Sequence, residues 1–266
     1  MKELLKVENL FVDFAAYNGT IHAVRGVSFS VYEGEMLAMA GESGCGKSVT
    51  AKAIMRLLGR SSAIISPDSA VLYEGMNLLT IPRRDLNRIR GSEISMVFQD
   101  AMAALNPTMT VGEQIAETIR IHKKTGRAEA TVRAAEFLSM VELPNSRDLL
   151  KCYPHELSGG QRQRVMIAMA LSCNPKLLIA DEPTTALDVT VQAQILSLLQ
   201  RLQKQLGMSV LLITHDLGIA AGIADRVQVM YAGQIVEKGS LKELFTAPRH
   251  PYTAALLTAI PRQNTS

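Results

Sequence analysis

Apolar residues recur along this chain in two patterns, short unbroken runs and longer helical repeats. The runs at 36–40 and 177–180 are four or five residues long, which is typical of strands buried on both faces of a parallel sheet. In stretches such as 191–205 the apolar residues return every three or four positions, as in an amphipathic helix. Strands that alternate with helices predict an α/β fold with a mainly parallel sheet and helices on its faces.

Two stretches depart from this alternation and set the expected domain organisation. The segments 4–14 and 21–31 flank Asn18-Gly19 and predict an antiparallel hairpin, the basis of an N-terminal antiparallel β subdomain. Between 110 and 150 the pattern is helical throughout, with a break near Thr125-Gly126, and predicts an inserted helical subdomain. We therefore expect one domain over 1–266, with a core at 1–99 and 159–240, a helical subdomain at about 100–158 and a C-terminal tail at 241–266.

The remaining expected elements follow the same patterns. The expected strands are 36–40, 70–73, 94–98, 176–180, 209–213, 227–231 and 234–237, and the expected helices are 49–58, 82–89, 161–172, 191–205 and 218–224.

Composition narrows the classes of protein. The chain has 266 residues, 47% of them hydrophobic, and a net charge of only +3, which does not favour a strongly basic nucleic-acid surface. Its three cysteines form no C-x-x-C pair, so we expect neither a disulfide framework nor a cysteine metal site. The first six residues lack a signal-peptide core, and no apolar run is long enough to cross a bilayer. These features favour a soluble protein in a reducing, cytoplasmic compartment.

The segment GESGCGKS at 41–48 matches the phosphate-binding loop G-x-x-x-x-G-K-[ST], between an expected strand and an expected helix. Backbone N–H groups of such a loop converge on phosphate oxygens, and the helix N-terminus adds partial positive charge. Lys47 is expected to reach the β- and γ-phosphates and Ser48 to offer its hydroxyl to Mg²⁺. The alternative is a glycine-rich turn, which the flanking elements disfavour. The candidate nucleotide-binding residues are Gly41, Glu42, Ser43, Gly44, Cys45, Gly46, Lys47, Ser48 and Val49.

Two carboxylates follow the apolar run at 177–180. A phosphate-loop ATPase needs one acid to hold Mg²⁺ through water and a second to accept a proton from the attacking water. Asp181 fits the first role and Glu182 the second. The alternative is two solvated acids before a turn at Pro183, and the phosphate loop elsewhere in the chain favours the catalytic interpretation.

The sequence LSGGQ at 157–161 suggests a second anion site, because a hydroxyl and two small residues open a helix. Ser158 and Gln161 also have the spacing of a capping box, in which each side chain bonds the other's backbone N–H. Both interpretations can hold together, since a capped helix that begins with glycines still exposes N–H groups.

These motifs, in this order, resemble those of the ATP-binding cassette (ABC) family. The residues that carry the resemblance are the phosphate loop, Gln99, 157–161, Asp181-Glu182, 186–188 and His215, which together cover nearly the whole chain. The resemblance implies a P-loop NTPase that works as a head-to-tail dimer with two ATP molecules in the interface. Each ATP is then held by the phosphate loop of one protomer and by Ser158, Gly159, Gly160 and Gln161 of the other.

The resemblance also assigns roles that the residues alone leave open. Gln99 is expected to sense Mg²⁺ and the attacking water, His215 to contact the γ-phosphate, and Asp188 to cross the dimer interface. Each has a structural alternative: a polar strand end, a structural histidine and a helix N-cap. An aromatic ring is expected to stack on adenine, and Phe14 and Tyr17 are the candidates, with a core position as the alternative for Phe14.

Two segments resemble one branch of the family. The sequence QDAMAALNP at 99–107 and the tail HPYTAALL at 250–257, followed by Ile260-Pro261, resemble the ATPase subunits of oligopeptide, dipeptide and nickel importers. The residues 41–44 and 48–50 resemble the first of two paralogous ATPases. Ala101 and Ala104 depart from the proline and serine usual there. Longer peptide-importer subunits carry a cysteine-rich segment, whereas no cysteine follows Cys173, so we expect no iron–sulfur cluster.

The implied function is ATP hydrolysis that powers an importer of dipeptides or oligopeptides, with nickel or a nickel chelate as the alternative cargo. The implied partners are a paralogous ATPase or a second copy of this chain, two transmembrane permease subunits and, through them, an extracytoplasmic binding protein. The protein would then lie peripherally on the cytoplasmic face of the membrane. A soluble ABC ATPase without a transport role is disfavoured, because such proteins usually carry two cassettes or a long coiled coil, and this chain shows neither.

Overall fold

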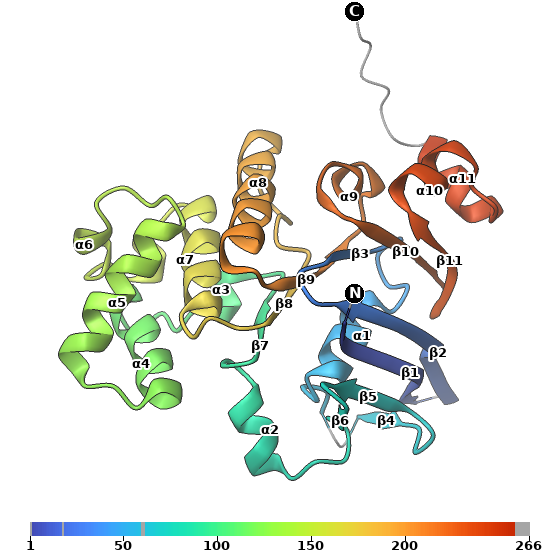
Figure 1. Cartoon of the computed structure of the whole chain (residues 1–266), viewed down its shortest axis with the longest axis horizontal. Coiled ribbons are helices and arrows are strands. Elements are labelled where there is room, and N and C mark those ends of the chain that lie inside the picture. The colour runs from blue at the N-terminus through green and yellow to red at the C-terminus, as the bar shows by residue number, and fades with distance from the viewer. Residues whose placement is uncertain (1, 18, 60–61, 259–266) are drawn as a thin grey trace, which may run out of the picture. The chain divides into compact units, whose positions relative to one another are not determined.

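The computed structural model describes residues 2–17, 19–59 and 62–258 (Figure 1). By their internal contacts the residues form two compact units, one of Met1–Pro82 with Ser209–Ser266 and one of Arg83–Met208. We call them the phosphate-loop unit and the signature unit, after the motif that each contains. The predicted boundaries of a helical subdomain at about 100–158 stay a prediction.

The N-terminal part of the phosphate-loop unit is an antiparallel sheet. Its strands are β1 (Glu3–Ala16), β2 (Gly19–Tyr32), β4 (Ala63–Ile65), β5 (Ala70–Tyr73) and β6 (Met76–Asn77). Their order is β2-β1-β5-β6, and β4 pairs with β1 beside this path. Val7 lies opposite Phe29 in the long β1–β2 pair, and both side chains are buried. The predicted N-terminal antiparallel subdomain is confirmed, whereas Asn18 of the predicted turn lies outside the described residues.

The second sheet segment of this unit is mostly parallel. Its strands are β3 (Met36–Ala40), β9 (Ser209–Thr214), β10 (Arg226–Tyr231) and β11 (Gln234–Ser240), in the order β11-β10-β3-β9. The β10–β3 and β3–β9 pairs are parallel, and β10 and β11 form an antiparallel hairpin. Every residue of β3 and β9 is buried, as the apolar runs at 36–40 and 210–213 predict. The hairpin turns at Ala232 and Gly233, both of which have positive φ, as in a tight two-residue turn.

Among its described residues, the phosphate-loop unit has the helices α1 (Lys47–Ile54), α9 (Leu217–Ile223), α10 (Leu241–Thr246) and α11 (Pro251–Thr258). Helix α1 ends four residues before the predicted end at Leu58, because Arg56 turns the backbone into the left-handed region with φ of 47°. The Arg56 guanidinium then donates to the carbonyl oxygens of Leu78 at 3.2 Å and Ile81 at 2.8 Å. The pattern did not predict α10 and α11.

The signature unit combines a parallel strand pair with most of the helices. Strands β7 (Ile94–Val97) and β8 (Leu177–Asp181) are parallel, with Val97 opposite Ala180. The helical elements are α2 (Arg83–Ile89), α3 (Ala101–Ala104), α4 (Val111–Lys123), α5 (Arg127–Met140), α6 (Ser146–Leu149), the 3₁₀ helix η1 (Pro154–Glu156), α7 (Gly159–Leu171) and α8 (Val189–Leu206). The buried face of α4 includes Ile115 and Ile119, which recur at helical spacing.

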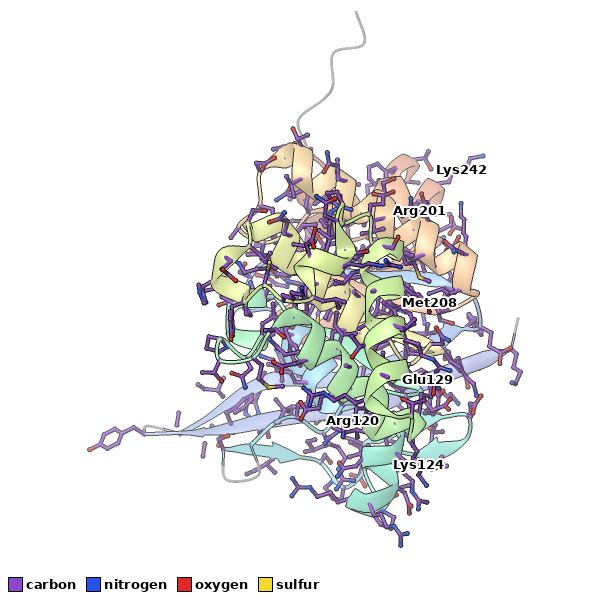
Figure 2. All side chains as sticks on the ribbon, turned by 90° about the vertical axis from the view of Figure 1, so that its left-hand side faces the viewer. Arg120, Lys124, Glu129, Arg201, Met208 and Lys242 are labelled. Carbon is purple, nitrogen blue, oxygen red and sulfur yellow. The ribbon has the colours of Figure 1, made fainter. Side chains whose placement is uncertain are left out.

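Helix α4 shows how local sequence sets these boundaries. Thr110 caps its first turn in a capping box with Glu113, and the helix ends at Lys123, followed by the C-cap residue Lys124 in a left-handed conformation with φ of 54°. Arg120 and Lys124 lie at its C-terminal end, where positive charge complements the helix dipole (Figure 2). The predicted break near Thr125-Gly126 is confirmed, because α5 begins at Arg127.

The structure confirms the predicted α/β class, with parallel strand pairs flanked by helices and an antiparallel N-terminal sheet. Across the described ranges, no helix is both long and apolar enough to span a membrane.

Candidate functional site

The phosphate loop connects the buried strand β3 to helix α1. Gly46 is the N-cap of α1 with φ of 108°, and a Cβ atom there would lie 2.4 Å from the carbonyl oxygen of Ala23. Only glycine fits this position without a shift of the backbone. Because the N-cap residue has no side chain, none caps the first turn of α1. Such a helix N-terminus is suited to bind an anion.

Lys47 lies inside the curve of this loop and is only 3% exposed. Its Nζ donates to the carbonyl oxygens of Gly41 at 2.7 Å and Glu42 at 2.8 Å, and lies 3.8 Å from the sulfur of Cys45. Burial raises the pKa of the Cys45 thiol, which keeps it neutral beside the ammonium. The loop therefore holds a positive charge at its centre, as the motif predicts.

His215 belongs to the same sheet edge. Strand β9 runs parallel to β3 with Thr214 opposite Ala40. Gly41 and His215 therefore each follow directly after the carboxyl end of one of these two neighbouring strands. His215 is exposed, and the next residue, Asp216, caps helix α9 by accepting from the N–H groups of Gly218 and Ile219. The structure thus places this histidine in the phosphate-loop unit, where a nucleotide-contacting role requires it.

The two aromatic candidates for adenine lie at the end of β1. Phe14 is half-buried and pairs with Ile21, and Tyr17 is fully exposed. Neither is a core residue, so the core alternative for Phe14 loses support. Both remain candidates for the stacking role.

Gln99 and Glu182 come together in the signature unit. The parallel pairing of β7 and β8 brings their carboxyl ends to one edge, where Asp181 and Glu182 are 2% and 8% exposed. The Gln99 amide donates to Oε2 of Glu182 at 3.0 Å, and the Thr185 hydroxyl donates to the same oxygen at 3.0 Å. Two donors fix the orientation of this carboxylate. Sequence analysis missed Thr185, although its position three residues after Glu182, across a turn, was a signal for such a bond.

The LSGGQ motif opens helix α7. The Ser158 hydroxyl accepts from the Gln161 N–H at 3.3 Å, and the Gln161 side chain accepts from the Ser158 N–H at 2.9 Å, so the predicted capping box is confirmed. Ser158 is nevertheless exposed. The motif is therefore both a helix cap and accessible from outside the chain.

Helix α8 begins against this motif. Asp188 is its N-cap and accepts from the Val191 N–H at 2.9 Å, which confirms the capping alternative without excluding a second role. A Cβ atom on Gly160 would lie 2.8 Å from Cγ1 of Val191, closer than real Cβ contacts. The LSGGQ motif and the Asp188 cap are thus packed directly together.

This close packing predicts that Gly160→Ala reduces ATP turnover by about tenfold, because overpacking costs about 1–3 kcal/mol and shifts the start of α7 or α8. Val191→Ala would remove the methyl group that the new Cβ meets, so the double variant should recover most of the rate. Turnover by phosphate release checks both. A single variant with wild-type turnover, or a double variant no better than the single, would show that the contact is not functional.

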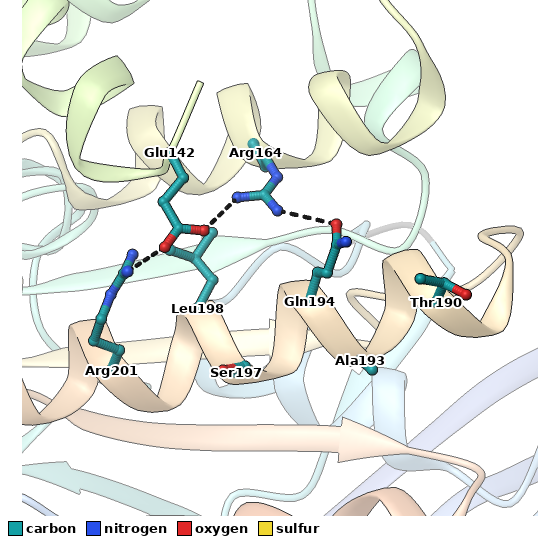
Figure 3. Close-up of a pocket in the computed structure, with 8 residues that line it drawn as sticks. All are labelled: Glu142, Arg164, Thr190, Ala193, Gln194, Ser197, Leu198 and Arg201. Atoms are coloured by element: carbon teal, nitrogen blue, oxygen red, sulfur yellow. Dashed lines mark hydrogen bonds and ion pairs between the residues drawn. The ribbon is translucent and has the colours of Figure 1, made fainter. Parts of the chain in front are cut away.

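An ion cluster joins the helices that carry these motifs. Glu142 follows α5 and accepts from Arg164 of α7 at 3.1 Å and from Arg201 of α8, and Arg164 also donates to Gln194 at 3.4 Å (Figure 3). The cluster lines a cavity of about 590 Å³ along α8. Hydrogen bonds from Arg201 and Arg164 lower the pKa of Glu142. The ionised carboxylate therefore stabilises the folded state.

We predict that Glu142→Gln destabilises the protein at pH 7, by at most about 1 kcal/mol because Glu142 and Arg201 are half-exposed. A carboxyl with a lowered folded pKa contributes stability above its unfolded pKa of about 4.3 and loses it as the pH falls through the folded value. The difference between the variant and the wild type should therefore shrink in acid. Urea unfolding midpoints of the variant and the wild type, measured at pH 7 and again below about pH 4.3, test this. Glu136→Gln, at an exposed position, is the control. A difference in midpoint that is the same at the two pH values would contradict the prediction.

Magnesium, which the phosphate-loop motif implies, prefers oxygen donors and keeps water or phosphate oxygens in its shell. The chain offers the Ser48 hydroxyl on α1, the Asp181 carboxylate at the end of β8 and the Gln99 amide. Among the described residues, no group of three or more His, Cys, Asp or Glu side chains could hold a metal ion. The phosphate-loop unit thus offers a hydroxyl, and the signature unit a carboxylate and an amide oxygen, which are donors of the kind that Mg²⁺ takes together with phosphate oxygens.

Comparison with known proteins agrees with this geometry. A family model described as "ABC transporter" matches residues 24–185, and one described as "Oligopeptide/dipeptide transporter, C-terminal region" matches residues 236–266. A solved structure of a post-hydrolysis dimer of the ATP-binding cassette MJ0796, bound to ADP and Pi, is similar with a TM-score of 0.79 and 30% identity, over 90% of this chain and 99% of that one.

Curated relatives are more similar in sequence. The dipeptide transport ATP-binding protein DppD of Bacillus subtilis is 53% identical over 98% of this chain and 78% of its own length. The oligopeptide transport ATP-binding protein OppD of the same organism is 52% identical over 99% of this chain and 73% of its length. The glutathione import ATP-binding protein GsiA of Escherichia coli K12 is 53% identical over 97% of this chain, which spans only 42% of that relative.

Proposed function

Because this chain belongs to the ABC transporter family, we propose that it is the ATP-hydrolysing subunit of an importer for dipeptides or oligopeptides. Family membership makes the chain an ATPase, as its sequence motifs predicted. The choice of peptide cargo is carried by one observation, the match of residues 236–266 to the C-terminal region of oligopeptide and dipeptide transporters. The names of the relatives, which are dipeptide, oligopeptide and glutathione transport proteins, support the same cargo class.

Nickel is the other cargo that the sequence leaves open. The segments 99–107 and 250–257 resemble the ATPase subunits of nickel importers as well as those of peptide importers. The names of the relatives favour peptides. The expectation of no iron–sulfur cluster stays an expectation.

For the nucleotide we propose the following roles. Lys47 and the backbone of 41–49 bind the phosphates, and Phe14 or Tyr17 stacks on adenine. Ser48, Gln99 and Asp181 would hold Mg²⁺, which when bound would neutralise phosphate charge during transfer. The Lys47 ammonium, held at the carbonyl oxygens of Gly41 and Glu42 within the loop, supports the phosphate-binding role, and the position of Asp181 at the end of β8 supports its role at the metal.

Glu182 is the proposed general base for the attacking water. Its carboxylate is fixed by Gln99 and Thr185, so it is presented in one orientation. His215 is the proposed contact for the γ-phosphate. Gln99, which is proposed to contact Mg²⁺ and the attacking water, also donates to Glu182, so proton acceptance would be linked to nucleotide binding.

The solved relatives of this fold are described as dimers or as parts of transporter complexes. We propose a head-to-tail dimer with a paralogous ATPase or a second copy of this chain. Ser158, Gly159, Gly160 and Gln161 would meet the ATP of the partner, and Asp188 would cross the interface. The exposure of Ser158 supports this, because a hydroxyl buried within its own unit could not reach a neighbour.

The dimer would dock on two transmembrane permease subunits at the cytoplasmic face of the membrane, and a binding protein outside would deliver the cargo. Affinity capture from membranes tests the assembly: we expect two hydrophobic permeases and a paralogous ATPase. Recovery of ribosomes or DNA would instead favour a soluble ABC ATPase.

Uptake of labelled dipeptide and of labelled nickel by a deletion strain identifies the cargo. We expect the wild-type chain to restore uptake of the dipeptide, and the control Glu182→Gln to restore neither. Rescue of nickel uptake alone would contradict the peptide proposal.

A further inference from the structure

The segment that follows β11 is pinned to the strand hairpin at its start. Glu237 of β11 accepts the backbone N–H of Arg249 at 2.7 Å and that of His250 at 3.0 Å, immediately before α11 begins. Burial acts to raise the pKa of Glu237, but the N–H donors of Arg249 and His250, together with Thr253 and the charge of His250, outweigh it and lower the pKa. The carboxylate therefore stays ionised and fixes the first turn of α11, which lies near α10 and β11 (Figure 1).

Tyr252, in the first turn of α11, reaches the phosphate loop. Its ring packs on Tyr231 at the end of β10, with ring centroids 4.4 Å apart and a tilt of 40°. Its hydroxyl accepts the backbone N–H of Glu42 at 2.9 Å, a bond between residues 210 positions apart. Burial raises the pKa of this hydroxyl, so it stays neutral. The C-terminal segment thus holds the backbone at the second position of the loop.

The peptide groups of Glu42 connect this contact to the loop lysine. Its N–H is bound by Tyr252, and its carbonyl oxygen accepts from Nζ of Lys47 at 2.8 Å. At the other end of the loop, the Gly233 N–H of the β10–β11 turn donates to the carbonyl oxygen of Cys45 at 2.9 Å. The β10–β11 hairpin therefore holds the loop at Cys45, and α11 holds it at Glu42.

We propose that the Tyr252 hydroxyl is a positioning group that presets the phosphate loop, so that nucleotide affinity depends on the docking of residues 249–258. This rests on the proposed nucleotide site at 41–49. A loop already held in its binding conformation loses less freedom when phosphate binds, and affinity rises accordingly. The C-terminal segment acts through the backbone of Glu42 and does not itself touch the nucleotide in this scheme.

The decisive variant is Tyr252→Phe, which removes the hydroxyl and keeps the ring on Tyr231. Titration of the full chain with a fluorescent ADP analogue should show about two- to tenfold weaker binding, the worth of one hydrogen bond. The matched control is Tyr231→Phe, which also loses one phenolic hydroxyl but leaves the Glu42 contact, and it should bind as the wild type does. Both variants should melt within a few degrees of wild type.

The outcomes separate the two proposals. Failure of the wild-type chain to bind the analogue would overturn the nucleotide site itself. Wild-type affinity in Tyr252→Phe, tighter binding in it, or equal weakening in Tyr231→Phe would overturn the positioning role while the nucleotide site stands.

A second variant tests whether the effect passes through docking of the segment. Glu237→Ala removes the acceptor of the Arg249 and His250 N–H groups and should weaken analogue binding in the wild-type background, by less than Tyr252→Phe does. In the Tyr252→Phe background it should have little further effect, because both changes act on one contact. Additive weakening in the double variant would show that Glu237 does not act through the Tyr252 hydroxyl, and would overturn the dependence on docking.

Discussion

Replacing Glu182 by glutamine is expected to reduce steady-state ATP turnover by about 10²- to 10⁴-fold, the contribution of a positioned general base. Glutamine has nearly the same size, and an amide oxygen can still accept the bonds that Gln99 and Thr185 donate at 3.0 Å. An amide cannot take up a proton at neutral pH, so the attacking water is left without a base. Phosphate release from the assembled complex measures this loss directly.

The same variant should still bind ATP, because Lys47 and the phosphate loop are untouched. Binding without hydrolysis should make an ATP-bound dimer accumulate, visible as a larger species by gel filtration that retains nucleotide. Glu117→Gln is the matched control, since it makes the same chemical change on an exposed face of α4 and should leave turnover unchanged. Wild-type turnover in Glu182→Gln would show that another group accepts the proton.

Much of this fold could be predicted because burial dictates residue type. Strands β3, β8 and β9 are buried along their whole length, and each contains an unbroken apolar run, namely 36–40, 177–180 and 210–213. The long amphipathic helix α8 buries Leu198, Leu199 and Leu202 at helical spacing. The motif residues could be predicted as well, because phosphate binding needs particular residues at fixed spacing.

The elements that the pattern missed are short or depend on distant partners. Strands β4 and β6 have three and two residues, too few to show any alternation. The end of α1 was set by Arg56, whose partners are the carbonyl oxygens of Leu78 and Ile81, more than twenty positions away. Patterns of neighbouring residues do not predict hydrogen bonds between residues this far apart in the sequence.

The same reason limits what sequence predicts about the site. Sequence placed Glu182 as the base and Gln99 near the reacting water, but their mutual bond follows from the parallel pairing of β7 and β8. The bond from Glu42 to Tyr252 spans 210 positions and joins a loop motif to a family-specific tail, two segments that the sequence presents as unrelated. Where distant segments meet, only the structure shows which motif residues act on one another.

Lys47→Ala should weaken ATP binding by about 10- to 100-fold, the worth of one or two hydrogen bonds from a charged donor. The ammonium is buried, and it is held by the carbonyl oxygens of Gly41 and Glu42, at the centre of the loop that would surround the phosphates. Alanine removes both the charge and the donor. Because ligand binding raises the melting temperature by mass action, the stabilisation by MgATP should fall with the affinity.

Lys52→Ala is the matched control for this prediction, because Lys52 lies on the same helix, α1, but is exposed. It should keep wild-type affinity and the full thermal stabilisation by MgATP. Lys47→Met separates folding from binding, since methionine retains a long apolar stem in place of the buried lysine and lacks only the charge. If either Lys47 variant melted as the wild type does and bound ATP with wild-type affinity, the loop lysine would not be the phosphate ligand, and the nucleotide site would have to lie elsewhere.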